Sequence, residues 1–339
     1  MIQEKAEFKP EPVFEKMPAE KFLAELAAEV EKRPDAVFEK RGVIKYQTPE
    51  GGKTYDFVRI ISNDIKPEDK ILFIRAGLHG EEIAGPMTMR RHINEIIDYA
   101  HQSGLKVVIY PLANPSGFES GERFNIVNDQ GGEGSEGTDD IIRYELSDGK
   151  IVDELEENQP FRQWFFPTAP RINARLPQEA ALMQKELKEL TQTGLLWEEL
   201  TQRELEEAPP PPIVAAIDLH QDYITPDAPP SAYHYNHNDQ VATEVYRKIV
   251  EKIEQELSIM RGAKISAGFK TSMKSDKYGF ITRHDGSLID AMYRLGAKHC
   301  IVVETTGATQ LEKADEVNML WIKGVIDLLI QAKGNEQLP

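Results

Sequence analysis

Short apolar runs, bounded by glycines or polar clusters, recur along the chain and predict buried β-strands. The clearest runs have the length and the β-branched content of strands that are covered on both faces, and they lie at 71–74, 106–110, 213–219 and 300–303. Two further strands are predicted at 43–46 and 55–61, with a turn at Gly51 and Gly52 between them.

Helical periodicity alternates with these runs. Apolar side chains recur at helical spacing in five stretches, at 19–32, 81–103, 178–191, 242–257 and 314–332. Strand, helix and strand follow one another between 71 and 110, which is the spacing of a βαβ unit and makes at least this part of the sheet parallel. The pattern therefore predicts an α/β protein with a mixed, largely parallel sheet flanked by helices.

The chain divides into a small N-terminal part and one large domain. Residues 1–38 are expected to form an N-terminal helical cap, and residues 39–339 the main domain. A long excursion at 126–212 starts with a glycine-rich acidic segment and ends in four consecutive prolines. An excursion of this length within one domain is typical of a lid or rim, so we expect it to form part of a cleft wall.

Composition excludes several classes of partner. The formal net charge of the 339 residues is −17, which argues against nucleic acid or an anionic membrane as a partner. No apolar run is long enough to cross a membrane, and the start of the chain has no apolar export signal. Cys300 is the single cysteine, which excludes an intrachain disulfide and fits a core position in a cytoplasmic protein. The oligomeric state is left open.

A histidine and a glutamate lie between the apolar run at 71–74 and the helix that follows. His79 and Glu82 are three residues apart at this strand-to-helix turn, so imidazole and carboxylate can point at one shared position. A metal ion is the usual occupant of such a position, and zinc accepts both ligand types. His-x-x-Glu is a short pattern, and its interpretation as a metal site depends on the rest of the chain.

Other polar residues follow the remaining strands in the same way. Asn114 and then Arg123 come after the strand at 106–110, His220 ends the strand at 213–219, and Glu304 ends the strand at 300–303. The carboxyl ends of parallel strands meet at one edge of a sheet, and sites of open α/β sheets lie there. Residues that are far apart in the sequence are therefore expected to converge.

The converging residue types fit metal-assisted hydrolysis of an amide bond. His79, Glu82 and His220 would supply three ligands to one zinc ion per chain and leave a fourth position for water, as in catalytic zinc sites. Glu304 is the candidate general base, which takes the proton of the water and passes it to the leaving amine. Arg123 is the candidate that polarises the carbonyl and stabilises the oxyanion. The expected partner is a peptide or a small-molecule substrate.

This set of motifs resembles the zinc carboxypeptidases and their succinylglutamate desuccinylase/aspartoacylase relatives. The matching pieces are His79-Gly-Glu-Glu82, the Asn114-Pro-Ser-Gly turn that leads to Arg123, Asp218-Leu-His220, and Val303-Glu304. The resemblance covers about residues 55 to 330, except for much of the excursion. It implies a zinc carboxypeptidase-like fold, with zinc bound by His79, Glu82 and His220 and with Glu304 as the general base.

The sequence also departs from the family pattern. The adjacent Asn-Arg pair, whose arginine binds the substrate carboxylate in the family, is absent, and the nearest segment has Asn173 in register but places the arginine, Arg175, one position away. The tyrosine that lines many carboxypeptidase sites has no clear counterpart. The candidate substrate-binding residues are therefore Asn114, Asn173, Arg175, Tyr278 and His284.

Several alternatives remain open at this point. A carboxypeptidase-like peptidase leads, an N-acyl amino acid deacylase of the succinylglutamate desuccinylase/aspartoacylase type is second, and a non-catalytic zinc-binding protein on the same scaffold is third. Asp218 either orients a ligand imidazole or pairs elsewhere. His234 and His237 suggest a second metal, although a polar loop that lines the cleft is the simpler expectation.

Overall fold

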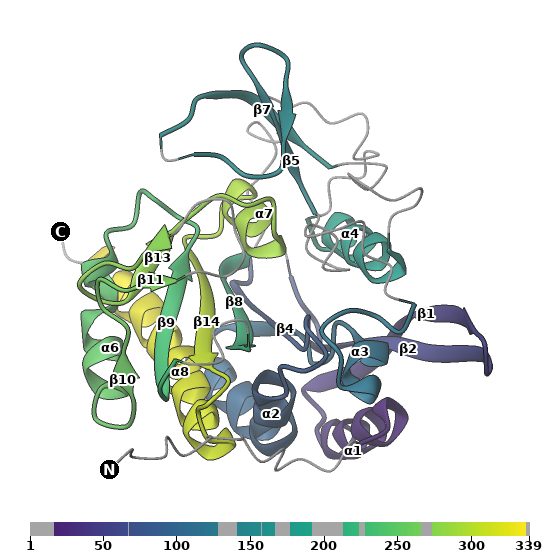
Figure 1. Ribbon diagram of the computed structural model, residues 1–339. Helices are drawn as coiled ribbons and strands as arrows, with labels where there is room; N and C mark the ends of the chain where they lie inside the picture. Colours follow the sequence, from purple (N-terminus) through teal and green to yellow (C-terminus); the bar gives the residue numbers. More distant parts are fainter. Residues whose placement is uncertain are drawn as a thin grey trace, which may run out of the picture.

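The computed structural model describes residues 17–66, 68–127, 141–156, 158–166, 177–191, 213–223, 228–265 and 273–336 of the chain. Its centre is a nine-stranded mixed sheet in the order β1-β2-β4-β3-β8-β14-β9-β10, with β13 paired to β9 (Figure 1). The strands are β1 (Ala36–Thr48), β2 (Gly51–Ser62), β3 (Ile71–Ala76), β4 (Lys106–Tyr110), β8 (Ile213–Asp222), β9 (Ser231–Asn236), β10 (Ser258–Ile259), β13 (Phe280–Thr282) and β14 (His299–Thr306).

The middle of the sheet is parallel, as the βαβ pattern predicts. Strands β4, β3, β8 and β14 run parallel to one another, whereas β1, β2 and β9 introduce the antiparallel pairs. Every residue of β3, β8 and β14 is buried except the half-buried Val214. This continuous burial explains why these strands are apolar runs rather than alternating patterns.

Helices cover both faces of the sheet (Figure 1). One layer contains α1 (Ala19–Val30), α2 (Ala84–Gln102), α6 (Arg247–Ile253) and α8 (Leu311–Glu336). The other face is covered by α4 (Gln178–Thr191) and α7 (Leu288–Arg294). The helices use their apolar stripes for this contact: α1 buries Phe22, Leu23, Leu26 and Val30, and α2 buries Ile93, Ile96, Ile97 and Ala100.

The described part of the excursion contributes α4 and a small antiparallel sheet, on the face of the main sheet that α7 also covers. A small antiparallel sheet joins β5 (Arg143–Leu146), β6 (Ile151–Val152) and β7 (Phe161–Phe165), and it adjoins α7 because the Ile142 amide donates to the Gly286 carbonyl. Helix α4 is fixed to the main sheet through Glu186, which accepts from Arg41, Arg59 and Tyr110. The role of this segment as a cleft wall stays a prediction.

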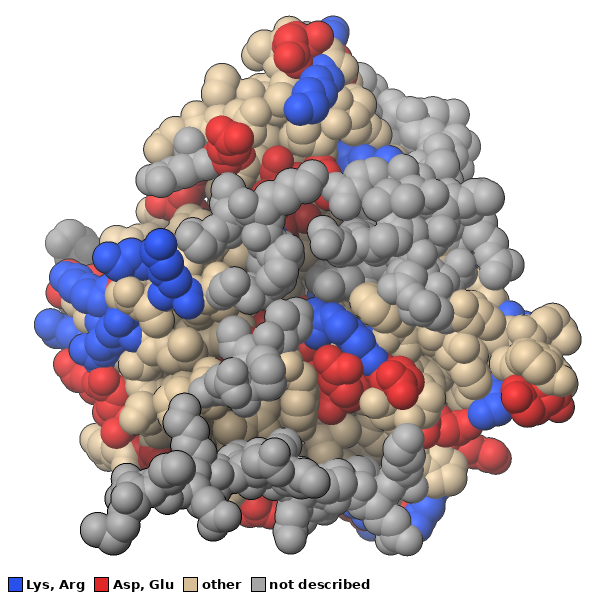
Figure 2. All heavy atoms as spheres, viewed as in Figure 1, with Lys and Arg blue, Asp and Glu red and all other residues tan. Residues whose placement is uncertain are grey.

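Short elements complete the chain: α3 (Pro115–Ser120), the 3₁₀ helix η3 (Thr243–Tyr246), β11 (Lys264–Ile265) and β12 (Met273–Lys274). Basic and acidic side chains lie side by side on the face shown in Figure 2. Among the described residues, every helix is too short or too polar to span a lipid bilayer.

Two expectations from the sequence were wrong in detail. The helix expected at 242–257 is a 3₁₀ turn followed by the two turns of α6. His234 does not belong to a polar loop, because it lies inside β9 and its fully buried ring packs edge-on against Trp321 of α8. Aromatic neighbours fill the space around its ring and place His234 in the core, away from any metal cluster of the described residues.

Candidate metal centre

The loop between β3 and α2 carries the first two ligand candidates. Gly77, directly after β3, has a φ of 67°, a left-handed conformation that glycine adopts without strain and that turns the chain away from the sheet. His79 and Glu82 then face each other across one turn, with His79 Nδ1 2.7 Å from Glu82 Oε1. Both side chains therefore come from a rigid turn at the carboxyl edge of the sheet.

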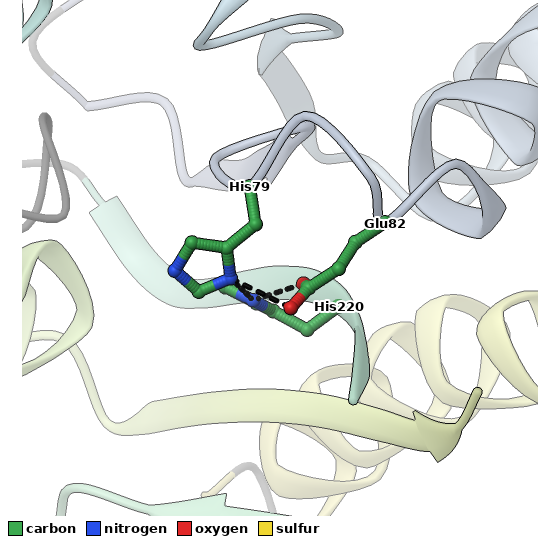
Figure 3. Close-up of side chains that lie close together, drawn as sticks. All are labelled: His79, Glu82 and His220. Carbon is green, nitrogen blue, oxygen red and sulfur yellow. Dashed lines mark hydrogen bonds and ion pairs between the residues drawn. The ribbon is translucent and has the colours of Figure 1, made fainter. Parts of the chain in front are cut away.

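His220 meets this pair from the neighbouring strand β8 (Figure 3). Its Nδ1 lies 2.8 Å from Glu82 Oε2 and 3.2 Å from His79 Nδ1. All three residues are buried: His220 is 4% exposed, Glu82 3% and His79 5%. They form the one group of three or more potential metal ligands among the described residues, with ligand atoms within 4.8 Å of one another.

The donor set fits a zinc ion. Tetrahedral zinc with Zn–N distances of 2.0–2.1 Å separates two ligand nitrogens by about 3.3 Å, close to the distance between the two Nδ1 atoms. Two ring nitrogens that face each other at this distance need either a proton or a cation between them. Two imidazoles and one carboxylate are also the ligand types that zinc prefers, and three protein ligands leave one coordination position open.

The electrostatics of the three residues favour a cation at this position. Burial alone would raise the pKa of Glu82, but the imidazoles of His79 and His220 lower it well below its usual range. Burial would lower the pKa of His220, but the carboxylates of Asp218 and Glu82 raise it well above the ordinary value. The cluster therefore holds positive charge on His220 when no other cation is bound.

A buried ion pair lies behind His220. Asp218 Oδ2 accepts from His220 Nε2 at 2.8 Å, and the guanidinium of Arg75 donates to both oxygens of Asp218. Although burial raises the pKa of Asp218, Arg75 and then His220 lower it, so the carboxylate is ionised. Of the two alternatives for Asp218, the structure shows both: it contacts the imidazole of His220 and it also pairs with Arg75.

Glu304 lies directly beside His220 on the neighbouring parallel strand, and the two are register partners of β14 and β8. Glu304 is 7% exposed, and its Oε2 has no hydrogen-bond partner among the described residues. Burial and the nearby carboxylates of Glu82 and Asp222 raise its pKa well above the usual range, whereas His220 and Arg123 act in the opposite direction. This arrangement leaves a carboxyl oxygen available for a proton at the edge of the ligand cluster.

Arg123 reaches the cluster because two loops are packed tightly together. The Gly80 amide donates to the Arg123 carbonyl at 3.1 Å, and a Cβ atom at Gly80 would lie only 1.9 Å from the carbonyl carbon of Gly117. The guanidinium then contacts Glu82 Oε1 at 3.1 Å and Glu81 Oε1 at 3.4 Å. A cationic donor is therefore held against the ligand carboxylate, at the oxygen that also faces His79 Nδ1.

Asn114 builds the loop that carries Arg123. Its side-chain oxygen accepts from the Gly117 amide at 2.9 Å and caps α3, and Pro115 occupies the first position of that helix. Its side-chain nitrogen donates to the Arg123 carbonyl at 3.4 Å. These contacts engage both ends of the Asn114 amide within the loop. Its predicted contact with substrate remains a prediction.

Of the other predicted substrate-binding residues, two lie beside β13 and two lie outside the described residues, and their contact with substrate stays a prediction. Tyr278 precedes β13, which is separated from β14 by β9. His284 follows β13, stacks on Tyr293 and contacts Asp290 at 3.1 Å. Asn173 and Arg175 lie outside the residues that the structure describes.

Two residues close to the cluster are not among the candidates predicted from the sequence. Arg75 was hidden inside an apolar run, where a charged residue is itself a signal because its burial requires a partner. Tyr223 follows β8, its ring lies against Gly307, and Glu82 and Glu81 contribute to its raised pKa after the effect of burial. Tyr223 lies three positions after His220 in the sequence, and this spacing is the signal that could have identified it.

Residues 68–129 match the family model of the succinylglutamate desuccinylase/aspartoacylase catalytic domain. The matched stretch contains His79, Glu82, Asn114 and Arg123. No curated protein matches the sequence.

Solved structures extend the likeness to most of the chain. A candidate metallopeptidase from Shewanella amazonensis SB2B is 18% identical, with a TM-score of 0.59 and coverage of 91% of this chain and 92% of that chain. A metallo-carboxypeptidase from Burkholderia cenocepacia is 12% identical, with a TM-score of 0.52 and coverage of 91% and 68%. Bovine thrombin-activatable fibrinolysis inhibitor, in complex with a tick carboxypeptidase inhibitor, is 11% identical, with a TM-score of 0.54 and coverage of 94% and 98%.

These comparisons confirm the carboxypeptidase-like α/β fold that the motifs predict, because all three structures align over at least 91% of the chain. The family match confirms the resemblance to the succinylglutamate desuccinylase/aspartoacylase group over the stretch that supplies His79 and Glu82.

Proposed function

We propose that this protein, which has a carboxypeptidase-like fold, is a zinc-dependent hydrolase that cleaves an amide bond. The observation that carries the proposal is the position of Glu304 beside a buried His79, Glu82 and His220 cluster. Three metal ligands next to a carboxyl group with an unpaired oxygen match the requirements of water activation. The hydrolase-type domain matched at 68–129 supports the same class of reaction.

Each side chain in and beside the cluster would have its own role in the reaction. His79, Glu82 and His220 would hold one zinc ion per chain. A zinc ion held there would act as a Lewis acid and lower the pKa of water to about 7. Glu304, in its ionised form, would accept the proton of the attacking water and deliver it to the leaving amine. Arg123, which contacts Glu82 Oε1, would donate to the developing oxyanion.

A carboxypeptidase-like peptidase is the first candidate, because the fold likeness extends over 91% of the chain. The substrate would then be a peptide with a free C-terminal carboxylate. An N-acyl amino acid deacylase is the second candidate, because the matched family model belongs to that group. The two differ in what lies next to the ligand cluster: a peptidase needs an open groove, and a small-acyl deacylase needs a closed pocket.

The test is hydrolysis by the zinc-loaded full chain of two substrate panels, peptides with a free or an amidated C-terminus and N-acyl amino acids. The peptidase proposal predicts cleavage of the free-ended peptides, and the deacylase proposal predicts release of the amino acid from the N-acyl compounds. Glu304→Gln should retain zinc and lose about 10²- to 10⁴-fold in turnover, the usual contribution of a general base. Glu312 is an exposed glutamate of α8, and Glu312→Gln is the matched control, which should be fully active.

Unchanged turnover in Glu304→Gln would reject the proposed mechanism. Zinc binding without hydrolysis of either panel would favour the third possibility, a non-catalytic zinc-binding protein on this scaffold.

A further inference from the structure

We infer that Arg75 is a positioning residue of the metal centre, which acts through Asp218 to fix which nitrogen of His220 faces the metal. The inference rests on the proposed zinc site and extends the site by two residues inside the sheet. Arg75 pairs with Asp218 and Asp218 accepts from His220, so the two contacts connect the guanidinium to the imidazole.

The chain of contacts is short and enclosed. Arg75 and Asp218 are register partners on the adjacent parallel strands β3 and β8. Arg75 Nε lies 3.1 Å from each oxygen of Asp218, and Nη2 donates to Oδ2 as well. The same Oδ2 accepts from His220 Nε2 at 2.8 Å. Arg75 is 0% and Asp218 1% exposed, so water does not replace any of these partners.

The hydrogen bond to Asp218 determines the tautomer of the ring. An ionised carboxylate only accepts hydrogen bonds, so a neutral His220 in contact with it carries its proton on Nε2. The lone pair is then on Nδ1, the atom that lies 3.2 Å from His79 Nδ1 and 2.8 Å from Glu82. A carboxylate behind a metal-binding imidazole fixes the ring in this way in many metal sites.

Arg75 pairs with that carboxylate and holds it in place. A charged carboxylate at 1% exposure needs a charged partner beside it. The planar guanidinium contacts both oxygens of Asp218 and leaves Oδ2 directed at His220, which a lysine ammonium with its single charged centre cannot reproduce.

Stability alone is a weak explanation for this pair. Replacement of a buried ion pair by apolar residues of similar volume is often neutral or stabilising, so stabilisation of the β3–β8 pairing does not by itself explain this pair. Arg75 is the only charged residue of β3, a strand whose other five residues are apolar. The feature that apolar residues could not supply here is the hydrogen bond to His220.

The experiment measures the zinc affinity of the full chain by competition with a chelator, together with the free energy of unfolding of the zinc-free protein. Arg75→Met and Asp218→Asn should each weaken zinc binding by about 10- to 100-fold, the usual effect of a residue behind a ligand. The double variant should bind zinc no more weakly than either single variant, because both changes weaken the same hydrogen bond, between Asp218 and His220. Arg75→Lys should be intermediate.

A second buried pair provides the matched control. Arg59 of β2 and Glu186 of α4 form an ion pair of comparable burial at 3.0 Å. Arg59→Met should lower the free energy of unfolding as Arg75→Met does, but it should leave the affinity for zinc unchanged. Equal zinc affinity in Arg75→Met and the wild type would overturn the inference, as would an equal loss of affinity in Arg59→Met.

A measurement on the wild type remains decisive if the Arg75 variants do not fold. In protein labelled with ¹⁵N-histidine and loaded with zinc, His220 should show a slowly exchanging proton on Nε2, and a proton on Nδ1 instead would overturn the inference. The expected affinities without any hydrolysis would leave the role of Arg75 intact and reject the proposed function. A wild-type protein that binds no zinc would overturn both.

Discussion

His79 and His220 place their Nδ1 atoms 3.2 Å apart, although 141 positions separate the two residues in the chain. One comes from a loop after β3 and the other from β8, the strand that pairs with β3 in parallel. The parallel pairing therefore puts two ring nitrogens, together with the Glu82 carboxylate, around a single position.

The first prediction concerns metal content. The wild-type protein should contain about one zinc ion per chain after zinc is supplied, and His79→Ala and His220→Ala should each lose it, because two remaining ligands bind zinc weakly. Elemental analysis of the purified proteins measures this. His92→Ala removes a histidine of α2 that pairs with Glu95 and Asp315, and it should keep the zinc. Equal zinc in all four proteins would refute the site.

The second prediction concerns protons released on zinc binding. The carboxylates of Asp218 and Glu82 raise the pKa of His220 despite its burial, so the ring is protonated in the zinc-free protein and must lose a proton to bind the metal. Zinc affinity should therefore rise with pH. Calorimetric titrations in two buffers with different heats of ionisation should differ, and identical heats would show that no proton is released.

The same raised pKa predicts how the stability of the zinc-free protein depends on pH. A group whose pKa is higher in the folded state stabilises the fold fully below its unfolded pKa, about 6.5 for histidine, and loses this contribution as pH rises through the folded value. The difference in free energy of unfolding between the wild type and His220→Gln should therefore be largest below about pH 6.5. It should shrink at higher pH, and a difference that grows instead would contradict the raised pKa.

The fourth prediction concerns Arg123. Arg123→Gln should lower kcat/KM by about 10²- to 10³-fold, the effect of removing one donor to an oxyanion, with zinc retained. Steady-state kinetics and zinc analysis of the same samples separate catalysis from metal loss. Arg91→Gln, on α2 at a distance from the cluster, is the control and should leave the kinetics unchanged. Full activity of Arg123→Gln would remove Arg123 from the mechanism.

The fifth prediction concerns the contact between the two loops. Gly80→Ala would place a Cβ atom 1.9 Å from the carbonyl carbon of Gly117, so the loop that carries His79 and the loop that carries Arg123 must separate. We expect a loss of about 1–3 kcal/mol in the free energy of unfolding, as for other overpacked sites, and a loss of activity with it. In Gly52→Ala the nearest atom is the end of the Gln47 side chain at 3.4 Å, so denaturant unfolding should show little change. Equal stability of both variants would exclude the tight packing.

Much of the ligand cluster was predictable because it depends on local pattern. The apolar runs at 71–74 and 300–303 correspond to β3 and the core of β14, and the helix predicted at 178–191 is α4. The His-x-x-Glu spacing and the position of His220 at the end of an apolar run were sufficient to place three ligand candidates at one sheet edge. The boundaries were less accurate, since β8 continues to Asp222 and β14 to Thr306, beyond His220 and Glu304.

Other features depend on which strands pair and which loops touch. Periodicity assigns Arg75 to a strand, but only the pairing of β3 with β8 places Asp218 opposite it. Likewise, the sequence places Arg123 after a strand, and only the close packing of Gly80 on the Gly117 turn brings its guanidinium to Glu82. His234 shows the converse case, because a histidine in a polar segment became a core residue once α8 packed on β9.

The parallel α/β class and the types of the metal ligands could be predicted from the chain, because hydrophobic periodicity and the order of strands are encoded locally. The contacts of Asp218 and Arg75 behind His220, the contact of Arg123 with Glu82 and the burial of Glu304 are visible only in the folded protein. These depend on strand register and loop packing between segments far apart in the chain, where a shift of one residue would turn each side chain to the opposite face of the sheet.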